Sequence, residues 1–495
     1  MKQIFNPFLP LNECIPDGEP HVFGDRVYLY GSHDKEDGET FCMLDYTVYS
    51  APVTDLKDWR CEGVIYRASQ DPDYPNRRYM YAPDVMQGSD GRYYLYYCMS
   101  GKDGHGGYFG PISVAVCDTP AGKYEYLGYV RNPDGSPLLV YVCFDPGVIN
   151  DNGVYRIYYG TQYNFEEEPD FFEREDLIGA EISMFGKSRE EIVSMAKKDS
   201  VMGPSMVVVG DDMLTIVDKP RHIIPVKVKG TDFEEHPFYE ASSMRKIKDT
   251  YYFIYSSQQN HELCYATSKY PDRDFRFGGT IVSNGDVGYN GRSEKDRLNM
   301  TGTTHGSIEN INGEWYVFFH RLTHKSDYSR QACAEKIIIK EDGSIDQVEI
   351  TSCGLNGGPL VGEGTYPAGI CCNLTNGHMP HGTNRKYDFA FPHVANDAKD
   401  RFIAEIENNT LIGYKYFDCK DVKKISVTLR GSGKGVFRVC IEDNKEIARI
   451  FMNPSEDWVE VSADVVVENG VHPLYFIYEE EAAGEVEMLS FSLAK

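Results

Sequence analysis

The sequence predicts an all-β protein in which a five-bladed β-propeller is followed by a jelly-roll-like β-sandwich. Three observations lead to this prediction. A polar turn followed by a tyrosine-rich strand occurs five times between residues 24 and 319. The chain contains 36 Tyr and 25 Phe, which are residues that favour strands. Beyond residue 420 the repeat gives way to short runs of alternating hydrophobic and polar residues, which are typical of antiparallel strands.

The repeat defines the blades. Its five copies are residues 24–31, 90–97, 152–159, 248–255 and 312–319, and they recur about every 60 to 66 residues, with one longer interval of about 96. A period of this length, with several short strands in each unit, is typical of a propeller blade. The alternative, one large β-sandwich, would space its strands more evenly.

The longer interval is interpreted as an insertion after the third blade. It contains an acidic stretch at 165–170 and a helix-like run at 188–198. Elsewhere, residues 47–53 and 112–117 are predicted as third strands of their blades. The pair 334–340 and 346–351, which an Asp-Gly turn joins, is assigned to the fifth blade.

A glycine-rich stretch separates the two predicted domains. Residues 354–369 contain repeated Gly and two Pro, which indicate the connection to a second domain. We therefore predict a catalytic propeller over 1–355, and a linker with a β-sandwich over 356–495. The sandwich strands are predicted at 423–429, 435–441, 458–461, 472–478 and 486–493.

Composition restricts the partners. A net charge of −26 disfavours nucleic acid and anionic membranes. No apolar window approaches a membrane span, and the N-terminus has no run that would suit a signal peptide, so we expect a cytoplasmic protein. The 13 Cys include no Cys-x-x-Cys pair, and we expect buried thiols and neither disulfides nor a zinc site. The sequence does not indicate an oligomeric state.

The residues just before each tyrosine-rich strand are the candidates for a functional site. In a propeller they lie where the innermost strands open onto one face, so five polar side chains should converge there: Asp17, Asp84, Asp145, Glu240 and His305. Glu240 stands between Tyr239 and small residues, where loss of solvation would raise the pKa of a carboxyl, as a general acid requires. A single glutamate beside a strand is usually a solvated surface residue. Acids at the same point of a repeat are harder to explain in that way.

These segments resemble family 43 of the glycoside hydrolases, from about residue 10 to residue 350. The matching motifs are residues 17–30 for blade one, Phe144-Asp-Pro-Gly-Val for blade three, Tyr239-Glu-Ala-Ser-Ser for blade four, Thr304-His-Gly-Ser-Ile for blade five, and the pair His320-Arg321. The resemblance implies a general base at Asp17, an acid-tuning residue at Asp145 and a general acid at Glu240. It also implies a sugar contact from Arg321. The sandwich is similar to a family 6 carbohydrate-binding module.

Two departures from the family pattern leave alternatives open. Asp17 is followed by Gly instead of Pro, and Glu19-Pro20 offers a rival acid; the distance to Tyr28 favours Asp17. The family's His is implied to contact a calcium ion in the channel, here at His305, but Thr304 replaces the expected Asn before it. The ligands of a metal are therefore not fixed by the sequence.

The chemistry follows from the carboxyl groups. Glycoside hydrolysis needs one acid to protonate the leaving oxygen and one carboxylate to activate water, and a wide separation of the two leads to inversion. Asp17 and Glu240 belong to blades that are not neighbours, so we expect inversion. Asp145 near Glu240 would raise the pKa of the acid by like-charge repulsion. Tyr81 and Phe144 could stack on the sugar or belong to the propeller core.

The resemblance implies an exo-acting enzyme that releases L-arabinofuranose, D-xylose or both from plant hemicellulose oligosaccharides. The alternatives are an arabinan- or galactan-cleaving enzyme of the same family and a non-catalytic sugar-binding propeller. The last would be expected to lack one of the three acids, and all three are present.

Overall fold

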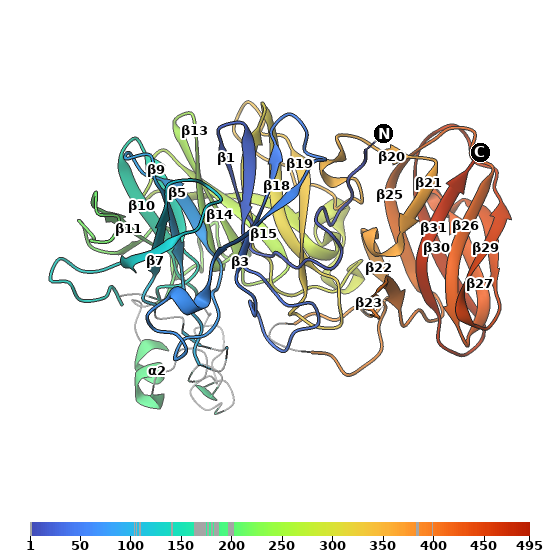
Figure 1. Cartoon of the computed structure of the whole chain (residues 1–495), viewed down its shortest axis with the longest axis horizontal. Coiled ribbons are helices and arrows are strands. Elements are labelled where there is room, and N and C mark those ends of the chain that lie inside the picture. The colour runs from blue at the N-terminus through green and yellow to red at the C-terminus, as the bar shows by residue number, and fades with distance from the viewer. Residues whose placement is uncertain are drawn as a thin grey trace.

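A computed structural model describes residues 2–102, 104, 106–107, 110–139, 142–162, 175, 178–179, 182, 188–196, 202–382, 386–397 and 399–495. Its architecture is a ring of antiparallel sheets followed by two packed sheets (Figure 1). The prediction of a propeller followed by a sandwich is confirmed. The acidic stretch at 165–170 lies outside the described residues. The helix-like run begins as α2 (Arg189–Ala196).

Each blade is a sheet whose strands pair in chain order. The strands of blades one to three are β1 (Glu19–Phe23), β2 (Arg26–Tyr30), β3 (Tyr46–Pro52), β4 (Arg60–Tyr66), β5 (Asp84–Gln87), β6 (Tyr93–Tyr97), β7 (Ser113–Cys117), β8 (Glu125–Tyr129), β9 (Gly147–Asp151), β10 (Val154–Tyr159), β11 (Ser205–Val209) and β12 (Arg221–His222). Those of blades four and five are β13 (Phe238–Ile247), β14 (Thr250–Ser257), β15 (Glu262–Ser268), β16 (Arg276–Ser283), β17 (Ser307–Ile311), β18 (Glu314–Leu322) and β19 (Arg330–Ile337).

Tight turns join the first two strands of each blade, as the repeat predicts. Asn152 and Gly153 both adopt positive φ, at 54° and 84°, between β9 and β10. Asn312 and Gly313 do the same between β17 and β18. Such turns match the right-handed twist of the paired strands, and Asn-Gly adopts them at low cost. The inner strand of each blade therefore begins at one end of the channel, and its tyrosine-rich partner returns to that end.

The fifth blade differs from the prediction. Among the described residues its sheet has three strands, and residues 346–351 form no strand. They run beside blade four instead, where the Val348 N–H donates to the Ile281 carbonyl at 2.8 Å. The free edge of β19 is covered by the N-terminus. The Phe8 N–H donates to the Ala332 carbonyl at 3.1 Å, and the Asn6 side chain bonds both backbone groups of Ala334. Blade five is thus completed from the start of the chain.

The C-terminal region consists of two six-stranded sheets. One contains β20 (Leu360–Val361), β22 (Asn373–Thr375), β25 (Leu411–Cys419), β27 (Lys434–Cys440), β28 (Glu446–Met452) and β30 (Gly470–Ala482). The other contains β21 (Gly364–Pro367), β23 (His393–Asn396), β24 (Arg401–Ala404), β26 (Lys424–Gly431), β29 (Ser455–Asp464) and β31 (Glu487–Ala494). Aromatic side chains fill the space between the sheets, with Tyr414 and Phe491 at a ring distance of 4.4 Å. This core supplies the apolar burial that stabilises the sandwich.

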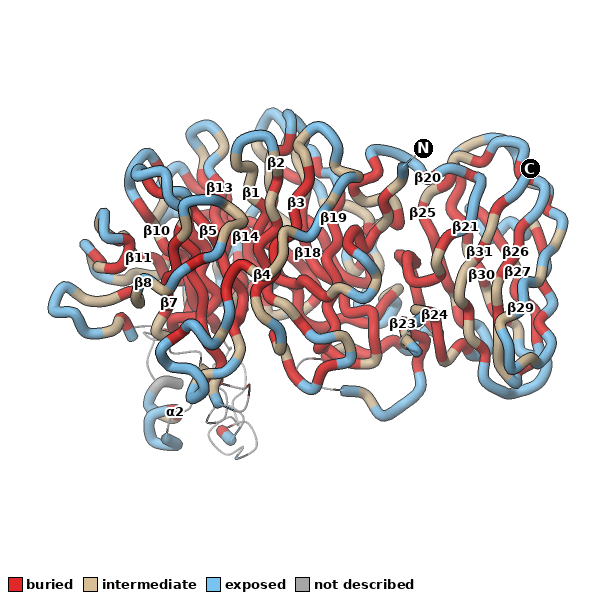
Figure 2. The backbone as a smooth tube through the Cα atoms, in the orientation of Figure 1, coloured by how far each residue is buried: buried red, intermediate tan, exposed pale blue. Residues whose placement is uncertain are grey.

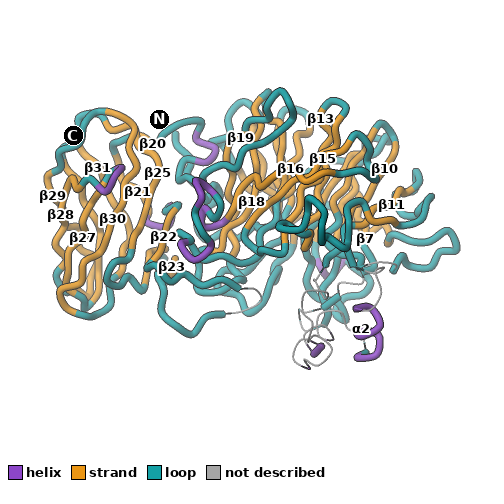
Figure 3. Tube along the Cα trace, turned by 180° about the vertical axis from the view of Figure 1, so that it is seen from behind, coloured by secondary structure: helices purple, strands orange, loops and turns teal. Residues whose placement is uncertain are grey.

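Most strands are buried, while many of the connecting turns at the periphery are exposed (Figure 2). Seen from behind, strands dominate both parts of the molecule, and the helical segments are short (Figure 3). No helix in the described ranges is long and apolar enough to cross a membrane. All 13 cysteines are free and ten are buried, but Cys117 and Cys353 are partly exposed and Cys61 is exposed, so the expectation of buried thiols is wrong for Cys61.

Candidate active site

A cavity that opens to solvent lies where the inner strands begin. Six of the seven predicted site residues line it: Asp17, Tyr81, Phe144, Asp145, Glu240 and His305. They come from five different blades, so only the closed ring brings them together. The cavity also exposes residues that the sequence analysis did not assign to the site, among them Phe41, Cys42 and Arg330.

The acids occupy unusual backbone conformations. Asp17 and Asp145 have φ values of 57° and 46°, and Ala241, next to Glu240, has 68°. Non-glycine residues rarely adopt positive φ, and such conformations cluster at functional sites. On β13 the register shifts between Glu240 and Ser243, which is a bulge. A bulge redirects a side chain, and here it follows directly after Glu240.

Asp17 is buried and held as a carboxylate. Its Oδ1 accepts a hydrogen bond from Arg330 Nη1 at 2.8 Å, and its backbone N–H donates to His320 Nδ1 at 3.2 Å. Burial opposes its ionisation, but the Arg330 charge and the hydrogen bond with His320 hold the pKa of Asp17 far below its usual range. A carboxylate that stays ionised at neutral pH can accept a proton from water.

Glu240 has the opposite character. Burial and the negative charge of Asp17 raise its pKa to about 8, and the Arg330 charge opposes this shift only in part. Glu240 is therefore mostly protonated at pH 7. A carboxylic acid that keeps its proton near neutral pH is suited to protonate a leaving group.

Asp145 interacts electrostatically with both of these acids. Its Oδ2 accepts a hydrogen bond from the Ala241 N–H at 3.2 Å and is 3.6 Å from His305 Nδ1. Burial and the charges of Glu240 and Asp17 raise the pKa of Asp145. Because the Ala241 N–H favours the ionised form of Asp145, we place the proton of this coupled pair on Glu240.

Glu19, the rival of Asp17, does not line the cavity. It lies deeper in the channel, where its Oε2 accepts hydrogen bonds from Arg245 Nη2 at 3.0 Å and from Ser243 Oγ at 3.1 Å. Burial and the charge of Asp84 raise the pKa of Glu19 to about 8. The geometry therefore separates the two blade-one acids, and Asp17 is the one at the cavity.

Arg321 does not lie at the cavity, in contrast to the prediction that it contacts the sugar. It is buried outside the cavity, where it donates hydrogen bonds to the Cys371 carbonyl at 3.0 Å and to Asn299 Oδ1 at 2.9 Å. The reason is strand alternation. His320 and Arg321 are successive residues of β18, so they point to opposite faces of the sheet, and His320 takes the face that meets Asp17.

Arg330 is the arginine of the site, and the sequence analysis missed it. It begins β19 and is only 5% exposed. Besides Asp17, it binds Asp34 through Nε and Nη2 at 2.8 and 3.0 Å. The local sequence carries little signal for this role, because four of the eight residues of β19 (RQACAEKI) are polar or charged.

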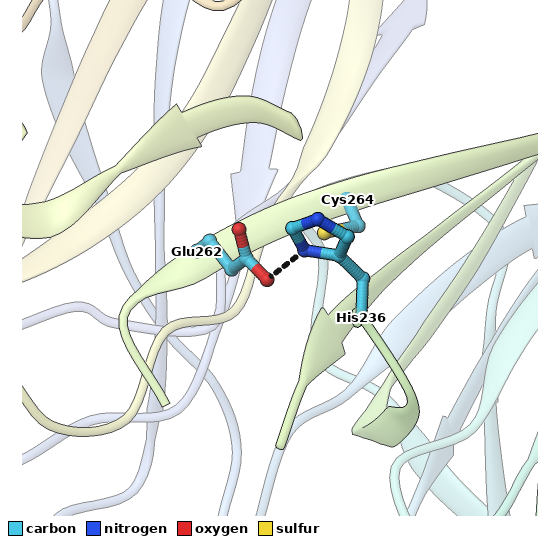
Figure 4. A group of neighbouring side chains, drawn as sticks. All are labelled: His236, Glu262 and Cys264. Atoms are coloured by element: carbon cyan, nitrogen blue, oxygen red, sulfur yellow. Dashed lines mark hydrogen bonds and ion pairs between the residues drawn. The ribbon is translucent and has the colours of Figure 1, made fainter. Parts of the chain in front are cut away.

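Two groups of side chains in the described residues have the spacing of metal ligands. In one, His236, Glu262 and Cys264 converge beside β15 (Figure 4). Glu262 already accepts hydrogen bonds from His236 at 2.6 Å, Ser257 at 2.5 Å and Thr280 at 2.8 Å, which explains the group as a hydrogen-bonded structural cluster.

The other group, Glu19, His21 and Asp84, lies in the channel. Glu19 Oε1 is buried and has no hydrogen-bond partner. The predicted calcium contact, His305, is nearer the cavity, with Nδ1 at 3.8 Å from Asp17 Oδ1. Burial lowers the pKa of His305 to about 4, so its ring is neutral at pH 7. A neutral imidazole surrounded by carboxylate oxygens fits a hydrated hard cation.

Comparisons with known proteins agree with this geometry. A family model described as glycosyl hydrolases family 43 matches residues 6–345. The chain is 44% identical to a xylosidase/arabinosidase of Thermoclostridium stercorarium, over 99% of each sequence. It is 28% identical to a xylosidase/arabinosidase of Bacteroides ovatus, over 63% of this chain and 87% of that protein.

A solved structure has a similar fold. It is a β-xylosidase/α-arabinofuranosidase from a compost microbial metagenome, in complex with xylotriose and in a calcium-free form. The TM-score is 0.50 at 25% identity, and the match covers 69% of this chain and 96% of that chain.

Proposed function

The chain belongs to glycosyl hydrolase family 43, and we propose that it is an inverting, exo-acting glycosidase that releases L-arabinofuranose, D-xylose or both from plant hemicellulose oligosaccharides such as arabinoxylan. The observation that carries this proposal is the pairing of two acids of opposite character in one cavity. Asp17 is held ionised and Glu240 is held protonated. Opposite protonation states identify the acid and the base of a glycosidase.

In the proposed mechanism, Glu240 donates its proton to the glycosidic oxygen while Asp17 removes a proton from the attacking water. Arg330 and His320 hold Asp17 in place, and Arg330 keeps it ionised. Asp145 keeps the proton on Glu240 by like-charge repulsion. Asp17 and Glu240 come from blades one and four, and a separation of about 6.5 to 9.5 Å would admit a water between them.

We assign the sugar contacts to the aromatic wall. Tyr81 and Phe144 both line the cavity, with ring centroids 5.4 Å apart and planes at 74°. Aromatic faces pack well against the apolar side of a sugar ring. Arg330 takes the place of Arg321 as the cationic contact of the pocket.

One calcium ion is proposed for the channel, with His305 as a protein contact and water as the remaining ligands. The neutral ring of His305 and the carboxylates of Asp17 and Asp145, at 3.8 and 3.6 Å from its Nδ1, support this assignment. When bound, such an ion would add positive charge below the pocket. We expect chelation to lower the melting temperature, and added calcium to restore it. An unchanged melting temperature, together with no heat of calcium binding, would argue against the ion.

We also propose the division of the chain after residue 355, with a module resembling a carbohydrate-binding domain over 356–495. The change from single blades to two paired six-stranded sheets after β19 supports this division.

The decisive experiment is hydrolysis of a panel of 4-nitrophenyl glycosides that includes the α-L-arabinofuranoside and the β-D-xyloside, with the product anomer followed by NMR. We expect cleavage of one or both substrates and an inverted product. Activity on arabinan or galactan oligosaccharides alone would indicate a different specificity. Sugar binding without any hydrolysis would indicate a non-catalytic propeller.

A further inference from the structure

One wall of the active-site cavity is a loop of blade one. Residues 34–42 connect β2 to β3 and contribute Phe41 and Cys42 to the cavity lining. Apart from an isolated backbone bridge between Asp34 and Cys14, the loop contains no helix or strand, so side-chain contacts contribute much to its position. What holds this loop therefore helps to determine the shape of the pocket.

Inside the propeller the loop is tied to the catalytic base. The Phe41 ring lies under the Arg330 guanidinium, at 4.5 Å, and meets the Tyr328 ring edge-on at 4.8 Å. Arg330 binds Asp34 at the start of the loop and Asp17 in the cavity. A displacement of the loop would thus disturb both the aromatic wall and the arginine that orients Asp17.

On its outer side the same loop is held by the C-terminal sheets. Arg401, at the start of β24, binds both carboxylate oxygens of Glu36, with Nε to Oε1 at 3.1 Å and Nη2 to Oε2 at 2.5 Å. Asn396, at the end of β23, donates to Asp37 Oδ2 at 2.5 Å. Lys386 pairs with Glu39 at 2.8 Å. Three acids of the loop therefore meet three polar residues from the C-terminal part of the chain.

The Arg401–Glu36 pair is the strongest of these contacts. Both side chains are mostly buried, at 19% and 14% exposure, and a forked arginine–carboxylate pair fixes orientation as well as distance. The fully buried His324 also lies 3.3 Å from Glu36 Oε1. Burial opposes ionisation of Glu36, yet hydrogen bonds from His324 and Arg401 lower its pKa to about 2. The pair therefore stays charged over the whole working range of pH.

The placement of β23 and β24 agrees with a role of these strands in holding the loop. Figure 2 shows β23 and β24 on the side of the sandwich that faces the propeller. The Val394 N–H of β23 donates to the Thr323 carbonyl at 2.8 Å, directly beside His324. The strands that carry Asn396 and Arg401 are thus anchored to blade five, close to the loop that they hold.

We propose that Arg401 is a positioning residue for the active site: through Glu36 it fixes the loop 34–42 and so holds the Phe41 wall of the sugar pocket. The C-terminal domain would thereby act on substrate binding without contacting the substrate. The kinetic test of this inference rests on the proposed glycosidase function, whereas the hydrogen-exchange test does not.

The test compares Arg401→Gln with a matched control in the full-length protein. Arg449→Gln removes a similar forked pair, in which Arg449 binds Glu446 at 2.7 and 3.0 Å within the sandwich. For Arg401→Gln we expect KM to rise about tenfold with a smaller fall in kcat, because the loop forms the pocket wall and also contacts the arginine that orients Asp17. Arg401→Lys keeps the charge but not the forked pair, so its KM should lie between those of the wild type and Arg401→Gln. The Arg449→Gln variant should match the wild type.

Hydrogen exchange gives the second readout. The peptide spanning residues 34–42 should exchange faster in Arg401→Gln than in the wild type, and Arg449→Gln should leave it unchanged. Unaltered exchange, or faster exchange with an unaltered KM, would overturn the proposal. So would equal effects of Arg401→Gln and Arg449→Gln. If the wild type cleaves no glycoside, the proposed function fails, and exchange of this peptide still decides whether Arg401 holds the loop.

Discussion

At the scale of single residues, the site depends on where two protons reside. The sequence already indicated Glu240 as an acid that loses solvation and Asp17 as its partner, because both stand at the same point of a repeat. It could not show what sets their pKa values. Arg330 and His320 are responsible for the ionised state of Asp17, and they reach it from the fifth blade, more than 300 positions away along the chain.

The leaving group should distinguish the two acids. Glu240→Gln should lose about 10²- to 10⁴-fold in kcat on substrates with poor leaving groups, yet much less where the leaving group needs no proton. Asp17→Asn should lose activity on both kinds of substrate, because water must be activated whatever departs. Kinetics on natural xylosides or arabinosides and on activated aryl glycosides would measure this.

Glu19→Gln provides the control for the base. Glu19 lies outside the cavity, so its loss should leave the leaving-group dependence intact, although Arg245 would lose a buried partner and the protein would be less stable. A severe catalytic defect in Glu19→Gln, together with a mild one in Asp17→Asn, would show that Glu19 and not Asp17 is the general base. Equal and slight effects of all these substitutions would contradict the mechanism.

The pH profile should report Glu240 directly. Its pKa of about 8 predicts that kcat/KM falls as pH rises through 8, because the general acid loses its proton. Asp145→Asn removes a like charge, which should lower the pKa of Glu240 and move this alkaline limb to lower pH. Profiles of both proteins on one substrate would test the shift. If the alkaline limb is at the same pH in both proteins, Asp145 does not raise the pKa of Glu240.

At the scale of elements, the five predicted tyrosine-rich strands coincide with β2, β6, β10, β14 and β18, because turn chemistry and strand composition agree there. The edges of blade five were predicted less well. Strand β19 begins at Arg330, four residues before the predicted start, because its first residues are polar side chains paired inside the protein. Its outer edge is covered by residues near the N-terminus, and no local pattern reveals a contact over that separation.

The bulge in β13 leads to a prediction about Ala241. Its φ of 68° suits glycine better than alanine, and a β-branched side chain is strongly disfavoured there. Ala241→Gly should therefore keep the activity, with stability within about 1 kcal/mol of the wild type. Ala241→Val should displace Glu240, lose most of kcat and lower the melting temperature. Thermal unfolding and kcat for both variants would test this, and full activity of Ala241→Val would show that the bulge does not aim Glu240.

At the scale of the whole molecule, the two parts of the chain share buried contacts. The Ser352 N–H donates to the Lys415 carbonyl at 2.7 Å, and Lys415 Nζ pairs with Glu349 at 2.8 Å. Arg321 depends on the Cys371 carbonyl. This explains why Arg321 could not be placed from the sequence: its partner Cys371 lies in the C-terminal region, between β21 and β22, and the motif that contains Arg321 does not indicate that contact.

Removal of residues 353–495 should therefore impair the propeller itself, in addition to removing the sandwich. Truncation would remove Arg401 and Asn396 from the loop that carries Phe41, and would expose the apolar residues that face the sandwich.

We expect the truncated protein to melt at a lower temperature and to raise KM at least as much as Arg401→Gln, that is, about tenfold or more. The relevant measurements are thermal unfolding, KM on the preferred aryl glycoside, and exchange of the peptide 34–42 in the truncated protein. A soluble, truncated propeller with unaltered KM would show that the pocket wall stands without the sandwich, and that the sandwich is only an appendage.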